Sequence, residues 1–280
     1  MDNDFARAMW RVLEPLHAVT YFAPSCTAAN KAAGFRGYWM GYFAARSAPL
    51  GAVGPGVIEA TFYNFHPAMI RRAIPDAWTF ATPEIALTTR STASAGALQA
   101  LVPDLAAVID EALPALQAAI AGAPAPGRAL FAANRDLPIP ADPVEALWQA
   151  ATTLREHRGD GHVGCLLAEG IDGCEAHVLF SADTGAPEQM WRDNRGWTET
   201  DWAAARDRLQ ARGLLDDSGI TDTGRNLRIH LESRTDELAM TAYRDIPDIA
   251  AALAALTPAA KAVAHSGAVP YPNPMGANPI

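Results

Sequence analysis

Apolar residues recur at helical spacing through most of the first half of the chain. Between residues 4 and 22 they fall three and four positions apart, which places them on one face of a helix. Shorter runs at 24–34 and 37–46 keep the same spacing. A longer run over 82–121 opens with threonine, proline and glutamate, the order typical of a helix start. The pattern predicts helices joined by segments rich in glycine and proline.

The second half opens with another helix start. Asp142-Pro143 combines a capping carboxylate with proline at the first helical position. We expect this helix to end at Gly159 and Gly161, because glycine is unfavourable inside helices and common at their ends. A separate short helix, capped by Asp160, is then expected over 162–169.

Residues 198–240 have the element order of a winged-helix unit. Thr198 and the acids that follow it are typical of a capped helix start. Leu214-Leu215 and Ile220-Thr221 are expected to form two short strands, because an Asp/Ser/Gly turn joins them. A return helix is expected over 226–240.

The two halves show a similar spacing of elements. Gly34-x-x-Gly37 and Gly170-x-x-Gly173 each follow an expected short helix and precede an apolar one, which indicates an internal repeat. The predicted fold is therefore all-α, with two related helical halves, the second carrying a winged-helix unit with one short β-hairpin. The predicted boundaries are 1–137 for the N-terminal helical half, 138–265 for the winged-helix-like half and 266–280 for a flexible tail.

Several runs of residues resemble known winged-helix proteins. The run RLQARGLLDDSGITDTGRNLRIHLESRTDELA resembles the wing region of MarR-type proteins. Over residues 8–240 the chain resembles a family of actinobacterial winged-helix-related proteins, through the runs LEPLHAVTYFAP, GFRGYWMGYFAARSAPLG, FYNFHPAMI, LREHRGDGH and RGLLDDSG. The resemblance implies a winged-helix scaffold.

Charge is distributed unevenly and argues against a nucleic-acid partner. The net charge is −9, and residues 1–140 hold equal numbers of acids and bases. The whole excess of acids therefore lies in the half with the expected wing, whose turn begins Asp216-Asp217. Because binding to duplex DNA normally needs a basic face, we expect DNA to be an unlikely partner.

The cysteines and the hydropathy pattern indicate a compartment. Cys26, Cys165 and Cys174 form no CxxC pair, and an odd number cannot pair fully within one chain. The sequence has no secretion signal and no long uncharged apolar run. We therefore expect a soluble, cytoplasmic protein with no membrane partner.

Residues 155–162 concentrate ionisable side chains. One interpretation is a solvated helix end with local ion pairs, and the other is part of a site. His162 and Cys165 would share a helix face, but their spacing matches no zinc motif, so no metal site is predicted. The candidate ligand-binding residues from this half are Arg155, His157, Arg158, His162 and His177.

Aromatic residues concentrate in the first half, with ten of them between residues 21 and 65. Most should be core, because aromatic side chains bury large areas. The others could form an apolar pocket with the polar groups between them, the usual form of a small-molecule site. The candidate ligand-binding residues from this half are His17, Tyr21, Arg36, Trp39, Tyr42, Phe43, Arg46, Asn64 and His66.

Three functions fit these patterns. The first is a small-molecule-binding protein on a winged-helix-derived scaffold, whose planar or aromatic ligand lies between the halves and suits the arginines best if it is anionic. The second is a MarR-like transcriptional regulator. The third is an enzyme that uses His157 or His162 as acid or base. No GxSxG, GxGxxG or GxxxxGK[ST] motif occurs, so no catalytic residue and no cofactor is assigned.

Overall fold

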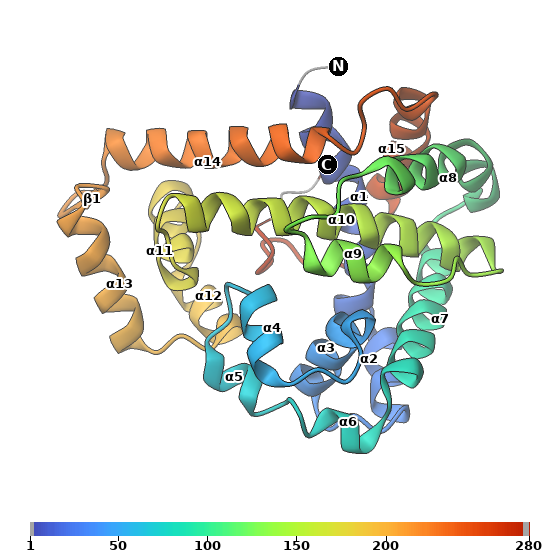
Figure 1. Cartoon of the computed structure of the whole chain (residues 1–280), viewed down its shortest axis with the longest axis horizontal. Helices are drawn as coiled ribbons and strands as arrows, with labels where there is room; N and C mark the ends of the chain where they lie inside the picture. The colour runs from blue at the N-terminus through green and yellow to red at the C-terminus, as the bar shows by residue number, and fades with distance from the viewer. Residues whose placement is uncertain (1–2, 277–279) are drawn as a thin grey trace.

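The computed structural model describes residues 3–276 and 280, and within them the fold is helical apart from one two-stranded sheet (Figure 1). The all-α prediction is confirmed. The elements, in order, are α1 (Asn3–Phe22), α2 (Pro24–Ala32), α3 (Tyr38–Ser47), the 3-10 helix η1 (Ala48–Leu50), α4 (Pro55–Thr61), α5 (Pro67–Arg71), α6 (Ala77–Phe80), α7 (Pro83–Leu101), α8 (Leu105–Gly122), α9 (Ala129–Arg135), α10 (Pro143–Ala168), α11 (Gly173–Thr184), α12 (Glu188–Arg195), α13 (Glu199–Ala211), β1 (Leu215–Asp216), β2 (Gly219–Ile220), α14 (Asp222–Met240) and α15 (Ile249–His265).

The largest core lies around α1 and the first half of α10. Leu13, Leu116, Trp148 and Leu256 are all fully or almost fully buried in it. These residues come from α1, α8, α10 and α15, so both predicted halves contribute to one core. The boundary near residue 137 stays a prediction.

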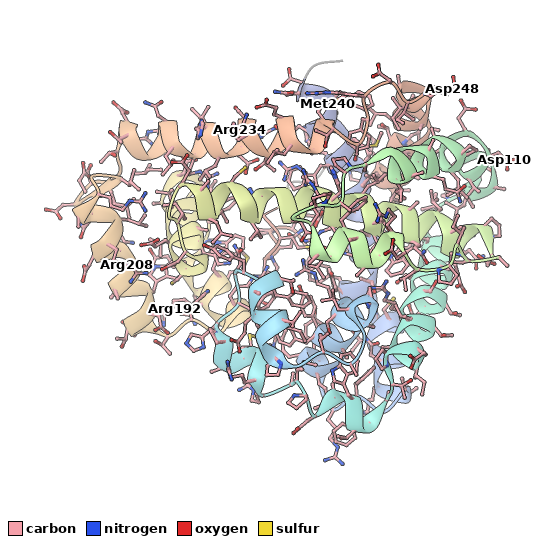
Figure 2. All side chains as sticks on the ribbon, in the orientation of Figure 1. Asp110, Arg192, Arg208, Arg234, Met240 and Asp248 are labelled. Atoms are coloured by element: carbon pink, nitrogen blue, oxygen red, sulfur yellow. The ribbon has the colours of Figure 1, made fainter. Side chains whose placement is uncertain are left out.

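Helix α8 is long and apolar enough, by length and composition only, to cross a membrane, and it is the one such helix among the described residues. Ile109 and Leu116 are buried in the first core, where α8 packs on α15 and α10, and Val108, Leu113 and Ile120 are partly buried against it. Asp110 and Glu111 are exposed, and Figure 2 shows Asp110 on the outer side of the helix. This is the pattern of an amphipathic core helix.

Helix α10 runs without interruption through Gly159 and Gly161, so the predicted break and the predicted short helix over 162–169 are wrong. Glycine is required at position 161 because the Arg128 side chain packs closely against the helix there. A Cβ on residue 161 would lie 2.6 Å from Nη1 of Arg128. That guanidinium donates to the carbonyl oxygens of His157 and Leu238 and so ties α10 to α14. Asp160 is not the N-cap of a helix over 162–169, and its Oδ2 instead accepts from the Phe131 amide, in the first turn of α9, at 2.9 Å.

The continuity of α10 also changes the comparison between the halves. Gly34 follows α2, a helix of nine residues, whereas Gly170 follows α10, a helix of 26 residues. The second half therefore lacks the short helix on which the predicted internal repeat depended.

The aromatic residues of the first half form a second core, as expected for most of them. Phe43 and Phe62 are fully or almost fully buried, with ring centroids 6.0 Å apart. Phe65 packs on Phe43 with centroids 5.1 Å apart, and Trp39 lies against the same cluster. This core fixes the position of the segment that follows α4.

The winged-helix unit, which comprises α11 to α14 with the hairpin between α13 and α14, has its own core, to which the end of α10 also contributes. Thr198 caps α13 in a capping box with Asp201, which confirms the predicted helix start. In the hairpin Leu215 pairs with Ile220, so the strands match the prediction to within one residue. Asp172 caps α11 in the same way as Thr198 caps α13.

Part of the predicted flexible tail packs against the protein. Val269 and Asn273 are buried, and Gly276 lies against Phe180 and Trp191. Residues 277–279 of this tail lie outside the described residues.

Candidate functional site

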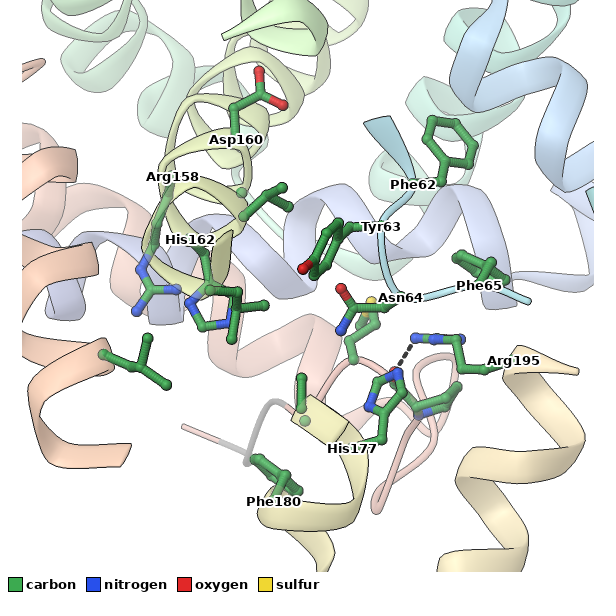
Figure 3. Close-up of a pocket in the computed structure, with 18 of the residues that line it drawn as sticks. Phe62, Tyr63, Asn64, Phe65, Arg158, Asp160, His162, His177, Phe180 and Arg195 are labelled. Carbon is green, nitrogen blue, oxygen red and sulfur yellow. Dashed lines mark hydrogen bonds between the residues drawn. The ribbon is translucent and has the colours of Figure 1, made fainter. Parts of the chain in front are cut away.

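A cavity of about 240 Å³ lies where the first half meets the winged-helix unit. Its walls come from α1, α3, α10, α11, α12 and α14, from the end of α4 and the segment after it, and from residues 274–276 of the tail. Figure 3 shows Tyr63 and Asn64 between two groups of polar side chains, with Arg158 and His162 on one side and Arg195 and His177 on the other.

The segment after α4 reaches the winged-helix unit because Gly173 has no side chain. A Cβ on Gly173 would overlap the carbonyl oxygen of Tyr63, a backbone atom that cannot easily move. The Tyr63 hydroxyl donates to the Ile171 carbonyl at 2.7 Å, and Trp197 Nε1 donates to the Asn64 carbonyl at 3.1 Å. The second glycine of the Gly-x-x-Gly motif thus allows the two parts of the cavity to meet.

One end of the cavity holds a closed network of buried charges. Arg46 donates from Nε and Nη2 to the two carboxylate oxygens of Glu156 at 2.9 and 3.0 Å. Arg155 lies 3.3 Å from Glu14 and 3.1 Å from Glu156. Burial would raise the pKa of Glu156, but Arg46 and Arg155 hold it well below its usual value. Two guanidinium groups and two carboxylates therefore compensate one another.

A second compensated group joins α10 to α14. Arg158 Nη2 lies 3.1 Å from Glu232 and 3.0 Å from Asp236. Arg7 lies 2.6 Å from Asp236, so each cation here also has an acid. The nearby His162 shares a hydrogen bond of 2.9 Å with the Thr235 hydroxyl, and burial lowers its pKa.

Arg195 differs from every other arginine that lines the cavity. Only 9% of it is exposed, and it forms no ion pair with a carboxylate among the described residues. Its guanidinium stacks 4.5 Å from the centre of the Phe65 ring and donates to the carbonyls of Asn194 and Pro274. Burial lowers the pKa of Arg195 to about 10, and Arg46 and Arg155 act in the same direction, so it stays charged at neutral pH.

Around Arg195 several polar atoms have no partner. His177 stacks on Trp191 with ring centroids 4.6 Å apart, and the Nε2 of His177 and the Nε1 of Trp191 are buried without a hydrogen bond. Burial lowers the pKa of His177 well below its usual value, and Arg195 lowers it further, so the imidazole is neutral. This end of the cavity therefore offers one positive charge and two ring nitrogens without partners.

Asp160 lines the opposite wall and forms no ion pair among the described residues. Burial raises its pKa to about 6, and the negative charge of Glu156 adds to the effect. Asp160 therefore titrates near neutral pH within the cavity.

The structure brings half of the predicted site residues to this cavity: Tyr42, Arg46, Asn64, Arg155, Arg158, His162 and His177. Tyr21 and Arg36 line a different cavity, which Tyr42 also borders. The five remaining predicted residues, His17, Trp39, Phe43, His66 and His157, line neither of these two cavities.

Packing explains the positions of these five residues. Trp39 and Phe43 belong to the second core, and the three histidines are held by other contacts. His17 is buried and shares a hydrogen bond of 2.9 Å with Thr152. His66 caps α5 by accepting from the Ala68 amide. His157 is buried edge-on against Phe131, and burial lowers its pKa to about 3, with Arg128 lowering it too. His157 therefore neither reaches the cavity nor titrates near neutral pH.

Sequence reasoning missed Arg195, Trp191 and Asp160 as wall residues. No local motif marks Arg195, because its neighbours Phe65 and Pro274 are distant in the sequence. Asp160 was noticed, but as a helix cap. Within the described part of the chain, no three His, Cys, Asp or Glu side chains are grouped so that they could hold a metal ion.

The outer face of the winged-helix unit has few available cations. On α13, Arg206 lies 2.6 Å from Glu188, and Arg208 lies 2.5 Å from Asp172 and 2.8 Å from Glu175. Figure 2 shows Arg208 on this helix. The helix that would enter a DNA groove in a winged-helix protein therefore has its arginines already paired with acids.

Comparison with known proteins gives one match. The sequence model of a helix-turn-helix family matches residues 6–270. No curated protein and no solved structure matches the chain. Because the match covers nearly the whole chain and includes the winged-helix unit described above, the chain belongs to this helix-turn-helix family.

Proposed function

We propose that this protein binds a small molecule that carries an anionic group, in the cavity between the first half and the winged-helix unit, with Arg195 as the partner of the anion. One observation carries the proposal. Arg46, Arg155, Arg158 and Arg228 each have a carboxylate partner, whereas Arg195 is buried without one. A buried charge without a counter-ion is unfavourable, and a bound anion would remove that cost.

The surroundings of Arg195 favour a flat ligand. Phe65 and Trp191 both lie near the guanidinium, with ring centres 4.5 and 6.0 Å from its central carbon. His177 adds a neutral ring and an unpartnered Nε2. A planar aromatic carboxylate would place its ring among these faces and its oxygens on the guanidinium.

The tail supplies the group that such an anion would replace. Arg195 Nη2 donates to the carbonyl of Pro274, drawn as the dashed line in Figure 3. A carbonyl dipole compensates a guanidinium less well than a carboxylate does. An anionic ligand would therefore compete with residues 274–276 for Arg195 and displace them from the cavity.

Binding of benzoate, which has one ring and one carboxylate, tests this proposal. Isothermal titration calorimetry should detect binding to the wild type, and Arg195→Gln should weaken it by about ten-fold or more, because the charge-assisted pair is lost. Arg225→Gln is the matched control, since Arg225 is exposed on α14 and does not line the cavity. Equal affinity of wild type and Arg195→Gln would contradict the proposal. Mass spectrometry of compounds that co-purify with each protein would identify the natural ligand.

A MarR-like DNA-binding regulator is the second candidate, and the family match with the winged-helix unit favours it. The pairing of Arg206 and Arg208 with acids and the net charge of −9 weigh against it. We expect no binding of mixed-sequence duplex DNA at sub-micromolar protein and physiological salt, measured by fluorescence anisotropy. Tight binding under these conditions would make regulation the better account.

A further inference from the structure

A second cavity, of about 440 Å³, lies within the first half between α1, α2 and α3. Its apolar walls are Phe35 and the rings of Tyr21, Tyr38 and Tyr42. Tyr42 also borders the cavity that contains Arg195, so the two cavities share this wall residue.

The residues that line this second cavity include two cations and no acid. Lys31 and Arg36 are both exposed on its rim. Lys31 has no ion pair among the described residues, and Arg36 lies over the Phe80 ring at 4.3 Å without a carboxylate partner. In a protein of net charge −9, this rim is a local concentration of uncompensated positive charge.

Two residues that line this cavity each have a buried polar atom without a partner. Tyr21 is 7% exposed, and its buried hydroxyl has no hydrogen-bond partner. The Oδ1 of Asn30, also on the wall, is buried and unpartnered. Burial raises the pKa of Tyr21 well above its usual value, and Tyr42 adds to this, so the hydroxyl remains a donor. Buried polar groups are normally hydrogen-bonded, so these two indicate a missing partner.

We infer that this cavity is a second binding site, for an aromatic monoanion of about two fused rings. The four aromatic walls fit the rings, the cations at the rim fit the charge, and the Tyr21 hydroxyl and Asn30 carbonyl fit polar substituents on the body of the ligand. The inference does not depend on the proposed function, because Arg195 does not line this cavity.

Titration calorimetry with 2-naphthoate tests the second site. The wild type should bind it, and the double variant Lys31→Gln/Arg36→Gln should bind about ten-fold more weakly, because both rim cations are lost. The control is Lys261→Gln/Arg225→Gln, which removes the same charges from exposed positions on α15 and α14 that line neither cavity. This control and Arg195→Gln should both keep the wild-type affinity.

Three results would overturn the inference. They are no binding by the wild type, wild-type affinity in Lys31→Gln/Arg36→Gln, or loss of binding in Arg195→Gln alone, which would place 2-naphthoate in the other cavity. Thermal unfolding of each variant without 2-naphthoate checks that it is folded, and exposed positions such as Lys31 and Arg36 should tolerate glutamine.

Discussion

The two ends of the cavity beside α10 contain similar residues in opposite electrostatic states. At one end Arg46 and Arg155 face Glu14 and Glu156, and every charge has a counter-ion. At the other end Arg195 is equally enclosed, yet its partners are carbonyl oxygens and aromatic rings. The comparison teaches that the number of arginines in a cavity does not identify a binding site. A buried arginine without a carboxylate partner identifies the binding site better, because only such a charge is stabilised by an added anion.

Removal of Glu156 should have the largest effect, because it breaks the compensated end. Glu156→Gln leaves Arg155 paired with Glu14 and removes the carboxylate partner of the buried Arg46, and we expect the free energy of unfolding to fall by about 3–5 kcal/mol. Urea denaturation followed by circular dichroism measures this loss. A change below about 1 kcal/mol would show that the network is not a closed set of buried pairs.

The contact that holds the two parts of the cavity together should be the next most sensitive. Gly173→Ala places a Cβ against the Tyr63 carbonyl, and overpacking of this kind costs about 2–3 kcal/mol. Gly164→Ala is the control, because Gly164 also lies in a helix and nothing approaches the position of its Cβ. Equal stability of the two variants would contradict the close approach.

Local sequence signals predicted the helix starts well, whereas the continuity of α10 depends on tertiary contacts. Thr198 and Asp142 were assigned correctly because a cap bonds to amides two or three residues away. The break at Gly161 was wrong because the packing of Arg128, which is distant in sequence, outweighs the low helix propensity of glycine.

In the candidate site, too, local sequence identified some residues, whereas others depend on tertiary contacts. Arg46, Arg155 and Arg158 were identified from their local clusters, and all three line the cavity. Arg195 could not be recognised, because its lack of a carboxylate depends on the folding of Phe65 and Pro274 around it. The histidines were the weakest prediction, since His17 and His157 are buried in packed surroundings that no sequence spacing reveals.

Asp160 is the acidic counterpart of Arg195, and it makes stability depend on pH. Its pKa of about 6 in the folded protein lies above the value near 3.9 of an unfolded aspartate, so folding favours the protonated form. Stability should therefore fall as pH rises from about 4 to 6 and stay lower above that range. Asp160→Asn, which keeps an acceptor for the Phe131 amide, should be more stable than the wild type by about 1–2 kcal/mol at pH 7.5 and equal to it at pH 4. A difference of the same size at both pH values would mean that Asp160 does not titrate in this window.

The account rests on the contrast between Arg195 and the compensated arginines, and one paired measurement tests it most directly. Thermal unfolding of Arg195→Gln and Arg158→Gln, each with and without benzoate, separates stability from binding. We predict that Arg158→Gln lowers stability by about 2 kcal/mol, because it leaves the two acids Glu232 and Asp236 with Arg7 as their one remaining arginine, and that the variant is still stabilised by benzoate. Arg195→Gln should unfold within about 1 kcal/mol of the wild type and gain nothing from benzoate. The opposite result, in which Arg195→Gln is strongly destabilised yet keeps the benzoate response, would contradict the account.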